Sequence, residues 1–387
     1  MLGIFVDSFR PAIDGVGVGQ YYTALELHKA GVDLSVVTAN AEGEPFQEPF
    51  DVKRLPTILL RNRKPYGYAF STLPSPVLSE VKGMDFDIVH CHSPFSVGLL
   101  GRKIARKNKV PFIATFHSKY WDDIYQATKS EGITELVVEK IVKFYTSADE
   151  VWIADPSIEK TLIEYGYYGP VEIVPMGIET AGVDWKSARV SCRHELDLAD
   201  DMPLFLFVGQ HIVHKNIDLI LDSLALLDDL PFRMLFVGTG NAKEQFEEKT
   251  IALGLGEKVK FAGLVSDRVQ LMSYYAAADL FLFPSLYDTF GNVIREAAAM
   301  HTPSLLLRES TCATFVEEGV NGFTSESTPQ AYADKIRELV NNRQHLDKVA
   351  DHVSQQLGSS WAEVVRDEII PRYEVLREKK LIGHNGK

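Results

Sequence analysis

Short apolar segments alternate with helical patterns along the whole chain. The first segment, Leu2–Val6, is almost entirely apolar, as in a strand that is buried on both faces. Val18–Leu25 then carries apolar side chains at the i, i+3, i+4, i+7 spacing of one helix face, and Gly31 ends that pattern. Because strands and helices keep alternating in this way, the pattern predicts parallel sheets covered by helices.

The predicted strands fall into two series. The first comprises Leu2–Val6, Leu34–Thr38, Asp87–His90, Phe112–Thr115, Glu150–Ala154 and Val171–Val174. The second comprises Leu204–Val208, Arg233–Val237, Val259–Phe261, Leu280–Phe283 and Ser304–Leu307. Residues 175–201 lie between them without a clear strand pattern. We therefore expect an α/β protein with two Rossmann-like, doubly wound parallel-sheet domains, residues 1–180 and 181–360, facing a cleft. The surplus helical segment, residues 361–387, is expected to pack back on the first domain.

Charge and cysteine content narrow the class of protein. The 387 residues include 40 Lys and Arg against 53 Asp and Glu, a net charge of −13, which disfavours nucleic acid as a partner. The three cysteines are far apart and odd in number, which fits a reducing cytosol rather than disulfides or a zinc site. No apolar run approaches ~20 residues, and the N-terminus lacks the pattern of a signal peptide, so we expect a cytoplasmic protein.

The loop after the first strand is rich in glycine. Residues 13–19 read Ile-Asp-Gly-Val-Gly-Val-Gly and lead into the first helix. Glycines let backbone amides approach a ligand, and a helix start favours an anion. The loop indicates a diphosphate or sugar site, or else a tight strand-to-helix turn. A nicotinamide cofactor is disfavoured because Gln20 stands where the G-x-G-x-x-G pattern requires its third glycine.

Three loops of the second domain carry candidate chemistry. Residues 209–216 read Gly-Gln-His-Ile-Val-His-Lys-Asn before a helix, and Lys215 could add its charge to the helix dipole to hold a diphosphate. The loops at Gly238–Gly240 and residues 263–265 offer backbone groups to a flat ligand such as a base, or are ordinary turns. Alone, Lys215 would be interpreted as a solvated loop lysine.

The most informative segment is residues 284–297, which follow a strand and enter a helix near Val293. Asp288 and Glu296 are eight residues apart and could grip hydroxyl groups at opposite ends of an extended ligand. The amides of Gly291 and Asn292 would face phosphate oxygens at the helix start. The structural alternative is an acidic first turn stabilised by the helix dipole.

Taken in order, these segments resemble the retaining glycosyltransferases of family 4, which have the GT-B fold of two Rossmann-like domains facing a cleft. The family has a glycine loop, D-[IV]-[IV]-H-x-H followed by T-x-H, a G-R-x4-K loop and an E-x7-E motif. The corresponding segments here are Gly15–Gly19, Asp87–His92, Thr115–His117, Gly209–Lys215 and Asp288–Glu296. Residues 147–149 and 174–178 also match, so the resemblance covers nearly the whole chain.

The resemblance implies roles for individual residues. Glu296 should bind the ribose of a nucleotide, Asp288 the hydroxyls of the donor sugar and Lys215 the diphosphate, while His117 should lie near the sugar and the attack site. The implied catalytic residues are His117, Lys215 and Asp288. The implied donor-binding residues are Gly15, Val16, Gln210, Lys215, Gly238, Gly240, Val265, Asp288, Phe290, Gly291, Asn292 and Glu296.

Two departures from the family pattern concern the donor site. Gln210 replaces the arginine of the G-R loop, which removes one charge from the expected diphosphate site; His211 or His214 could restore it if protonated. Asp288 replaces the first glutamate of E-x7-E and is one methylene shorter. No cofactor or metal is expected, because the nucleotide-sugar is a substrate, apart from a non-specific Mg²⁺ dependence. His90, Cys91 and His92 are expected to serve packing rather than metal binding.

The implied function is retaining transfer of a hexosyl group from a nucleotide-sugar, with UDP-glucose as the type case, to an acceptor hydroxyl. Retention is expected to proceed by front-face attack, in which the leaving diphosphate helps to take the acceptor proton. The alternatives are a transferase for a capsule or surface polysaccharide, a weakly active donor-binding partner of another transferase, and a GT-B nucleotide-sugar epimerase. The sequence carries no indication of the oligomeric state.

The acceptor is expected to bind the first domain. Residues 92–101 and 115–125 look most like the branch that glucosylates diacylglycerol, which implies a glycolipid precursor as acceptor. Residues 101–109 hold five basic residues and no acid, and residues 65–70 add Tyr66, Tyr68 and Phe70. Basic residues beside aromatic ones suit an anionic membrane surface, although such runs are commonly solvated helix faces. We therefore expect peripheral attachment to the inner face of the cell membrane.

Overall fold

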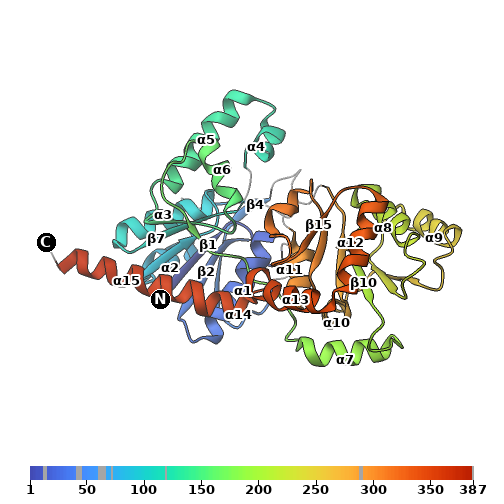
Figure 1. The fold of residues 1–387 in the computed structure, drawn as a ribbon. Helices are drawn as coiled ribbons and strands as arrows, with labels where there is room; N and C mark the ends of the chain where they lie inside the picture. Colours follow the sequence, from blue (N-terminus) through green and yellow to red (C-terminus); the bar gives the residue numbers. More distant parts are fainter. Residues whose placement is uncertain are drawn as a thin grey trace. The chain divides into compact units, whose positions relative to one another are not determined.

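The computed structural model describes residues 1–11, 15–40, 46–59, 67–70, 73–117, 120–286 and 291–385. The chain divides into unit 1, Met1–Gly177 with Trp361–Lys387, and unit 2, Ile178–Ser360 (Figure 1). The first break lies close to the boundary placed at residue 180, and the second precedes Trp361, where the predicted terminal segment begins. The chain thus leaves unit 1, forms unit 2 and returns to unit 1.

Unit 1 is built on a seven-stranded parallel sheet with the order β3-β2-β1-β6-β7-β8-β9. Its strands are β1 (Leu2–Val6), β2 (Leu34–Ala39), β3 (Asp51–Leu55), β6 (Ile88–Cys91), β7 (Phe112–Phe116), β8 (Glu150–Ile153) and β9 (Glu172–Ile173). Apart from the sheet, β4 (Thr57–Leu59) pairs with β5 (Gly67–Ala69) as an antiparallel hairpin. The central strands are wholly buried, as their continuous apolar sequences predict.

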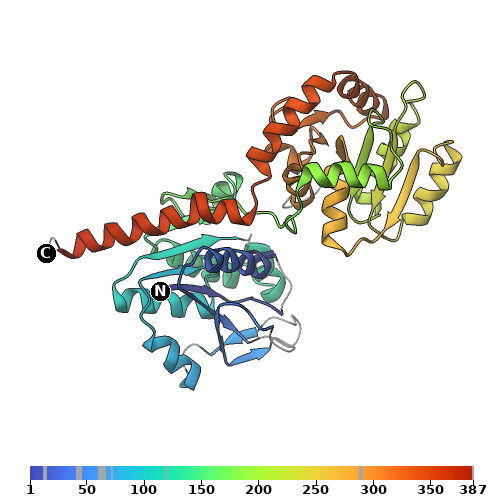
Figure 2. The same cartoon turned by 90° about the horizontal axis from the view of Figure 1, so that it is seen from below.

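Helices cover both faces of this sheet (Figures 1 and 2). Side chains of α1 (Gly15–Lys29) and of the returning C-terminal segment pack with Leu2, Ile4 and Val6 on one face. Side chains of α2 (Pro76–Gly83), α3 (Ser96–Asn108), α5 (Glu131–Tyr145) and α6 (Ser157–Glu164) pack with Phe5 on the other. The helix α4 (Tyr120–Thr128) packs against α5. The alternation of strand residues between the two faces produces this double covering.

The C-terminal segment is helical, as predicted, but interrupted. It runs as α14 (Trp361–Val364), a π-helical turn η3 (Val365–Ile369) and α15 (Ile370–Asn385). Val364, Val365, Ile369, Tyr373 and Leu376 face the same core as β1. The segment follows unit 2 in sequence yet completes the core of unit 1, as expected for residues 361–387.

Unit 2 is built on a six-stranded parallel sheet with the order β12-β11-β10-β13-β14-β15. Its strands are β10 (Leu204–Val208), β11 (Arg233–Val237), β12 (Val259–Gly263), β13 (Leu280–Phe283), β14 (Ser304–Leu307) and β15 (Phe323–Ser325). Its α-helices are α7 (Trp185–Glu195), α8 (Ile217–Leu224), α9 (Lys243–Ala252), α10 (Arg268–Ala277), α11 (Asn292–Ala299), α12 (Pro329–Asn341) and α13 (Arg343–Leu357), and the 3-10 turns are η1 (Val213–Lys215) and η2 (Thr311–Phe315). A single continuous hydrophobic core joins the sheet to these helices.

Several elements differ from the sequence-based expectation. The strands β3 and β15 and the hairpin β4–β5 were not predicted. The edge strand β3 reads Asp-Val-Lys-Arg-Leu, which lacks an apolar run, and the others have three residues each. Such short or polar segments become strands because a neighbouring strand offers hydrogen bonds, which sequence patterns do not record.

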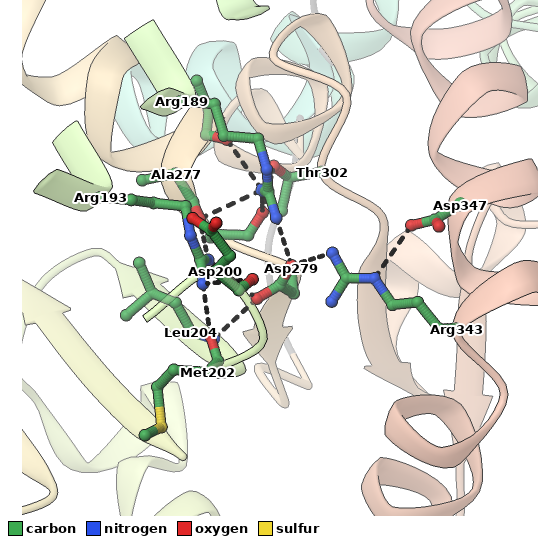
Figure 3. Close-up of polar contacts among 12 residues, drawn as sticks. Arg189, Arg193, Asp200, Met202, Leu204, Ala277, Asp279, Thr302, Arg343 and Asp347 are labelled. Carbon is green, nitrogen blue, oxygen red and sulfur yellow. Dashed lines mark hydrogen bonds and ion pairs between the residues drawn. The ribbon is translucent and has the colours of Figure 1, made fainter. Parts of the chain in front are cut away.

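A buried carboxylate closes the amino-terminal edge of the sheet in unit 2. The side chain of Asp279, just before β13, is 1% exposed and accepts a hydrogen bond from the Leu204 amide at the start of β10 (2.8 Å). Three guanidinium groups surround it, from Arg189 (2.5 Å), Arg343 (2.6 Å) and Arg193 (3.2 Å) (Figure 3). Burial acts to raise the pKa of Asp279, but Arg189, Arg343 and the Leu204 amide outweigh it and hold the pKa below its usual range.

Two of these arginines, Arg189 and Arg193, also donate hydrogen bonds to backbone carbonyls. Arg189 donates to the carbonyls of Ala276, Ala277 and Ala278 at the end of α10, and Arg193 donates to Met202 (2.6 Å). The last carbonyls of a helix have no partner within it, so Arg189 acts as a side-chain cap. Asp279 thereby connects α7, α10, α13 and two central strands (Figure 3).

We expect Asp279→Ala to lower the stability of unit 2 by about 3–5 kcal/mol, because it leaves the buried guanidinium of Arg193 and the partly buried one of Arg189 without their counter-charge. Differential scanning calorimetry should show a lower melting temperature for one transition. Asp347→Ala is the matched control, since Asp347 also contacts Arg343 (3.1 Å) but is 62% exposed. Equal melting temperatures for the two variants would contradict the assignment of Asp279 as the anchor.

Candidate functional site

In unit 2 the order of strands reverses at β10 and β13. Along the chain, β11 and β12 are added to the sheet on one side of β10, whereas β14 and β15 are added on the opposite side, next to β13. Loops that leave the carboxyl ends of β10 and β13 therefore start side by side and diverge. The Nδ2 atom of Asn216 donates to the carbonyl of Pro284 (3.4 Å), which joins these two loops. The predicted donor-binding residues of unit 2 that the structure describes come from this end of the sheet.

Lys215 lies in the loop after β10, in the short turn η1. Its Nζ atom lies 5.1 Å from the centre of the Phe283 ring at the end of β13. Asn216 follows in the left-handed conformation (φ 56°) and starts α8. Lys215 therefore lies where both central strands end, which is the position expected for a diphosphate contact. Gln210, in the same loop, is exposed.

His211 does not restore the charge that the Gln210 position lacks. The side chain is 0% exposed and is enclosed by the rings of Phe207, Phe236 and Phe261, with centroid distances of 6.2, 6.3 and 5.7 Å. Burial and the nearby Lys243 lower the pKa of His211. The residue is therefore neutral near pH 7 and serves packing.

The glycines of the next loop are required by close approach. An added Cβ atom on Gly238 would lie 1.9 Å from the carbonyl oxygen of Gly209, and one on Gly240 would lie 2.3 Å from that of His211. The His211 amide also donates to Thr239 (3.0 Å). The loops after β10 and β11 thus lie directly against each other. Val265, after β12, is partly buried against the core.

The loop after β13 leads into α11. Gly291 takes the left-handed conformation (φ 58°) as the residue before the helix, and Asn292 is its first residue. The first amides of a helix have no partner within it and can face an anion. Asp288 and Phe290 lie outside the described residues, so their predicted roles stay predictions.

Glu296 lies one turn into α11 and is held by two side chains. Its Oε1 atom is 2.8 Å from Nη1 of Arg268, and its Oε2 atom accepts a hydrogen bond from the Tyr275 hydroxyl (3.0 Å). Nε and Nη2 of Arg268 also donate to the carbonyl of Glu179 (3.1 and 2.7 Å). The carboxylate is 16% exposed. Since each carboxylate oxygen accepts two hydrogen bonds, Glu296 keeps acceptor capacity for a ligand.

Sequence reasoning missed Arg268 and Tyr275. Both lie on α10, more than twenty residues before Glu296 in the sequence. The hydroxyl of Tyr275 donates its hydrogen bond to the carboxylate of Glu296. Burial raises the pKa of Tyr275 well above its usual range, so the hydroxyl stays a donor. An isolated arginine after a helix-capping Asp267 carries no signal by itself. The pairing exists because α10 packs beside α11.

In unit 1 the order of strands reverses between β1 and β6. Asp7, which follows β1, accepts hydrogen bonds from the hydroxyls of Ser93 (2.5 Å) and Ser96 (2.7 Å) and from the amides of Val97 (3.0 Å) and Gly98 (3.5 Å). Burial raises its pKa, and these four bonds act against that rise. The hydrogen bonds of Asp7 therefore serve to hold the start of α3 and not to bind a ligand.

His117 is partly buried beyond β7 and lies beside two other histidines. Its Nε2 atom is 3.1 Å from Nδ1 of His92, and the rings of His92 and His90 are 4.0 Å apart. Burial lowers the pKa of His90 and of His92 well below the usual range, so both are neutral near pH 7. The structure thus brings His117 together with two residues of the D-x-x-H-x-H segment.

The glycine loop precedes α1, which begins at Gly15 and Val16. A Cβ atom on Gly17 would lie 3.1 Å from the Ser8 carbonyl oxygen, and one on Gly19 would lie 3.1 Å from the Met176 side chain. Gly17 and Gly19 are therefore explained by packing. Gly15 and Val16 stand at the helix start, where ligand contact was predicted.

Within the described ranges, no three His, Cys, Asp or Glu side chains gather as a metal site. The three cysteines are buried free thiols. Over the same part of the chain, no helix is both long enough and apolar enough to cross a bilayer.

The two doubly wound sheets, each with polar loops at a reversal of strand order, define the GT-B class of glycosyltransferases. The model of glycosyltransferase family 4 matches residues 13–181, and the model of glycosyl transferases group 1 matches residues 191–356. The chain belongs to these GT-B glycosyltransferases of family 4.

Two similar enzymes and one solved structure are 18–26% identical to this chain. The chain is 26% identical over 309 residues to an alpha-monoglucosyldiacylglycerol synthase of Streptococcus pneumoniae, covering 78% of this chain and 70% of the relative. It is 24% identical over 358 residues to the enzyme of the same name from Acholeplasma laidlawii, covering 89% and 87%. Among solved structures, Anabaena Alr3699/HepE in complex with UDP has a TM-score of 0.65 at 18% identity, covering 97% of this chain and 99% of that one. This last likeness concerns the fold.

Proposed function

We propose that this glycosyltransferase moves a glucosyl group from UDP-glucose to a diacylglycerol hydroxyl with retention of the anomeric configuration. Binding of the nucleotide-sugar donor is supported by one observation: Lys215, the start of α11 and Glu296 lie together at the carboxyl ends of β10 and β13. Cation, helix amides and carboxylate are the groups that a diphosphate and a ribose require. The relatives named alpha-monoglucosyldiacylglycerol synthase support the acceptor.

Glu296 suits the ribose because its surroundings fix its orientation. Arg268 and Tyr275 hold both oxygens from one side, and the side chain retains 16% exposure. A ribose presents two adjacent hydroxyl donors, and a carboxylate is an acceptor-only group. Ligand hydroxyls would therefore complete its hydrogen bonding.

Lys215 suits the leaving diphosphate. Charge builds on that group as the bond to the sugar breaks, and preorganised cations and amides lower the barrier when they meet charge that is absent in the ground state. Because His211 is buried and neutral, it does not share this role. In front-face attack the leaving diphosphate takes the acceptor proton, so retention needs no carboxylate nucleophile.

The surface of unit 1 supports a lipid acceptor. At the start of α3, Phe95 and Leu99 are each 39% exposed, and Lys103 and Arg106 are exposed further along the helix. Lys107 and Lys109 are also exposed, whereas Arg102 packs over the Phe144 ring (5.7 Å). Of the five basic residues in the predicted cluster, four are thus exposed, and Arg102 is partly buried. An apolar start followed by basic residues suits an anionic bilayer surface.

The hairpin beside α3 adds apolar surface. The cross-strand partners Ile58 and Tyr68 are 59% and 56% exposed. The amide of Ala69 donates to Ser96 at the start of α3 (3.1 Å), so the hairpin and the apolar end of α3 are neighbours. Tyr66 lies outside the described residues, and Phe70 is partly buried. Exposed aromatic and aliphatic groups of this kind insert at a membrane interface.

The function is tested by incubating the protein with UDP-glucose and dioleoylglycerol vesicles, with a soluble saccharide mixture in parallel. We expect a glucosylated lipid with an α-linkage, since the donor is α-linked and retention preserves it. Proton NMR of the anomeric signal gives the linkage. A β-linked product would reject retention, and product in the saccharide reaction alone would favour the surface polysaccharide alternative. UDP-glucose converted to an epimer would favour the epimerase alternative.

We expect Glu296→Ala to weaken UDP-glucose binding by about 1–3 kcal/mol, the loss of a charge-assisted hydrogen bond. Isothermal titration calorimetry measures the affinity, and thermal unfolding confirms that the variant is folded. Glu244→Ala on α9 removes an acid of the same type in the same unit and should leave the affinity unchanged. Equal affinities for both variants would remove Glu296 from the donor site.

We expect the double variant Lys103→Glu with Arg106→Glu to bind anionic vesicles at least about thirtyfold more weakly, since each lost cation contributes about 1 kcal/mol near the lipid. Vesicle sedimentation at low and high salt measures the binding, which should fade with salt. Lys186→Glu with Lys348→Glu makes the same charge change on exposed residues of unit 2 and is the control. If both double variants sediment alike, α3 is not the attachment surface.

A further inference from the structure

Three histidines from two neighbouring strands form a row in unit 1. His90 and His92 lie on one face of β6 and its continuation, and His117 follows β7. The ring centroids of His90 and His92 are 4.0 Å apart, and those of His92 and His117 are 5.3 Å apart and stacked. His117 has a predicted role beside the sugar, whereas His92 was expected only to serve packing.

The backbone of His92 is held by strand pairing and its ring by the neighbouring His90. Its amide donates to the Phe5 carbonyl (2.9 Å), which continues the pairing of β6 with β1. Its ring packs on His90, whose Nδ1 atom is 2.7 Å from the hydroxyl of Tyr373 and whose Nε2 atom is 2.6 Å from that of Thr115. With both ring nitrogens engaged, His90 cannot rotate freely. Tyr373 comes from α15, so the returning helix supports this row.

The environment of His92 favours one tautomer. The residue is 3% exposed, and its pKa is lowered well below the usual range by burial and by the neighbouring His90 and His117, so it is neutral near pH 7. Among the described residues, its Nε2 atom has no hydrogen-bond partner. A buried N–H group without an acceptor is rarer in proteins than an acceptor without a donor. The proton therefore belongs on Nδ1, which faces Nε2 of His117 at 3.1 Å.

We propose that His92 is a positioning residue that donates its Nδ1 hydrogen to Nε2 of His117 and thereby fixes His117 in the tautomer protonated at Nδ1. Since a neutral imidazole carries one proton, an Nε2 atom that accepts a hydrogen bond requires the proton on the other nitrogen. His117 then meets its ligand with an N–H donor. A sugar hydroxyl or a phosphate oxygen can accept that bond.

The consequence for the reaction depends on the proposed function. If the ligand is a nucleotide-sugar, a fixed donor at His117 orients the sugar without the need to select a tautomer in each catalytic cycle. Orientation that is complete before reaction raises the turnover more than the affinity. The tautomer itself is a property of the free protein and can be measured whether or not transfer occurs.

The test compares His92→Asn with His92→Leu. The amide nitrogen of asparagine can occupy the place of Nδ1 and donate, whereas leucine has the same shape without a donor. Two-bond ¹⁵N–¹H spectra of the full-length protein should show His117 protonated at Nδ1 in the unsubstituted chain and in His92→Asn. His92→Leu should shift His117 toward the Nε2-protonated form that predominates in free imidazoles.

In transfer from UDP-glucose, we expect His92→Leu to lower kcat about tenfold, the worth of one oriented hydrogen bond, with little change in KM, and His92→Asn to recover most of kcat. The proposal is overturned if His117 carries its proton on Nε2 in the unsubstituted protein, or if the two variants have the same tautomer. It is also overturned if both variants lose kcat equally. Should His92→Leu fail to fold, the spectra of the unsubstituted protein and His92→Asn still decide, and absence of transfer by all three would count against the proposed function alone.

Discussion

The reversal of strand order in each parallel sheet is the constraint on which the polar chemistry of this protein depends. Parallel strands need crossover helices, and where the order reverses, two adjacent loops at the carboxyl ends diverge and leave their backbone groups accessible. In unit 2 this brings Asn216 and Pro284 into hydrogen-bond contact across 68 positions of the chain. In unit 1 it brings Asp7, after β1, to the start of α3, after β6.

Two buried carboxylates mark opposite ends of the sheets. Asp279 lies at the amino-terminal edge in unit 2, where three arginines and a strand amide surround it, so that end is closed by internal ion pairs. Asp7 lies at the carboxyl end of the sheet in unit 1, where it accepts hydrogen bonds from hydroxyls and amides at the start of α3. Glu296 differs from both, because its two partners leave acceptor capacity and an exposed edge. A carboxylate can bind a ligand only if some of its hydrogen-bond acceptor sites are left unused by the protein.

The loop after β10 shows how packing decides chemistry. Its sequence offers three residues that could carry a positive charge: His211, His214 and Lys215. His211 is removed from that role by the aromatic rings that bury its side chain. The loss of the family's arginine at Gln210 is therefore not compensated by this neighbour, which leaves Lys215, the exposed His214 and helix amides for the expected diphosphate contact.

The sequence by itself determined the fold class, the two series of central strands and the class of enzyme, because continuous apolar strands, helix periodicity and ordered motifs are local properties of the chain. It also indicated Lys215, His117 and Glu296, whose residue types match a known pattern. Only the tertiary structure assigned Arg268 and Tyr275 to Glu296, Asp279 to its arginines and Tyr373 to His90, since these pairings arise when elements separated in the sequence pack side by side. The edge strand β3 and the neutrality of His211 were likewise decided by neighbours, because pairing and burial are properties of the folded environment and not of the residues alone.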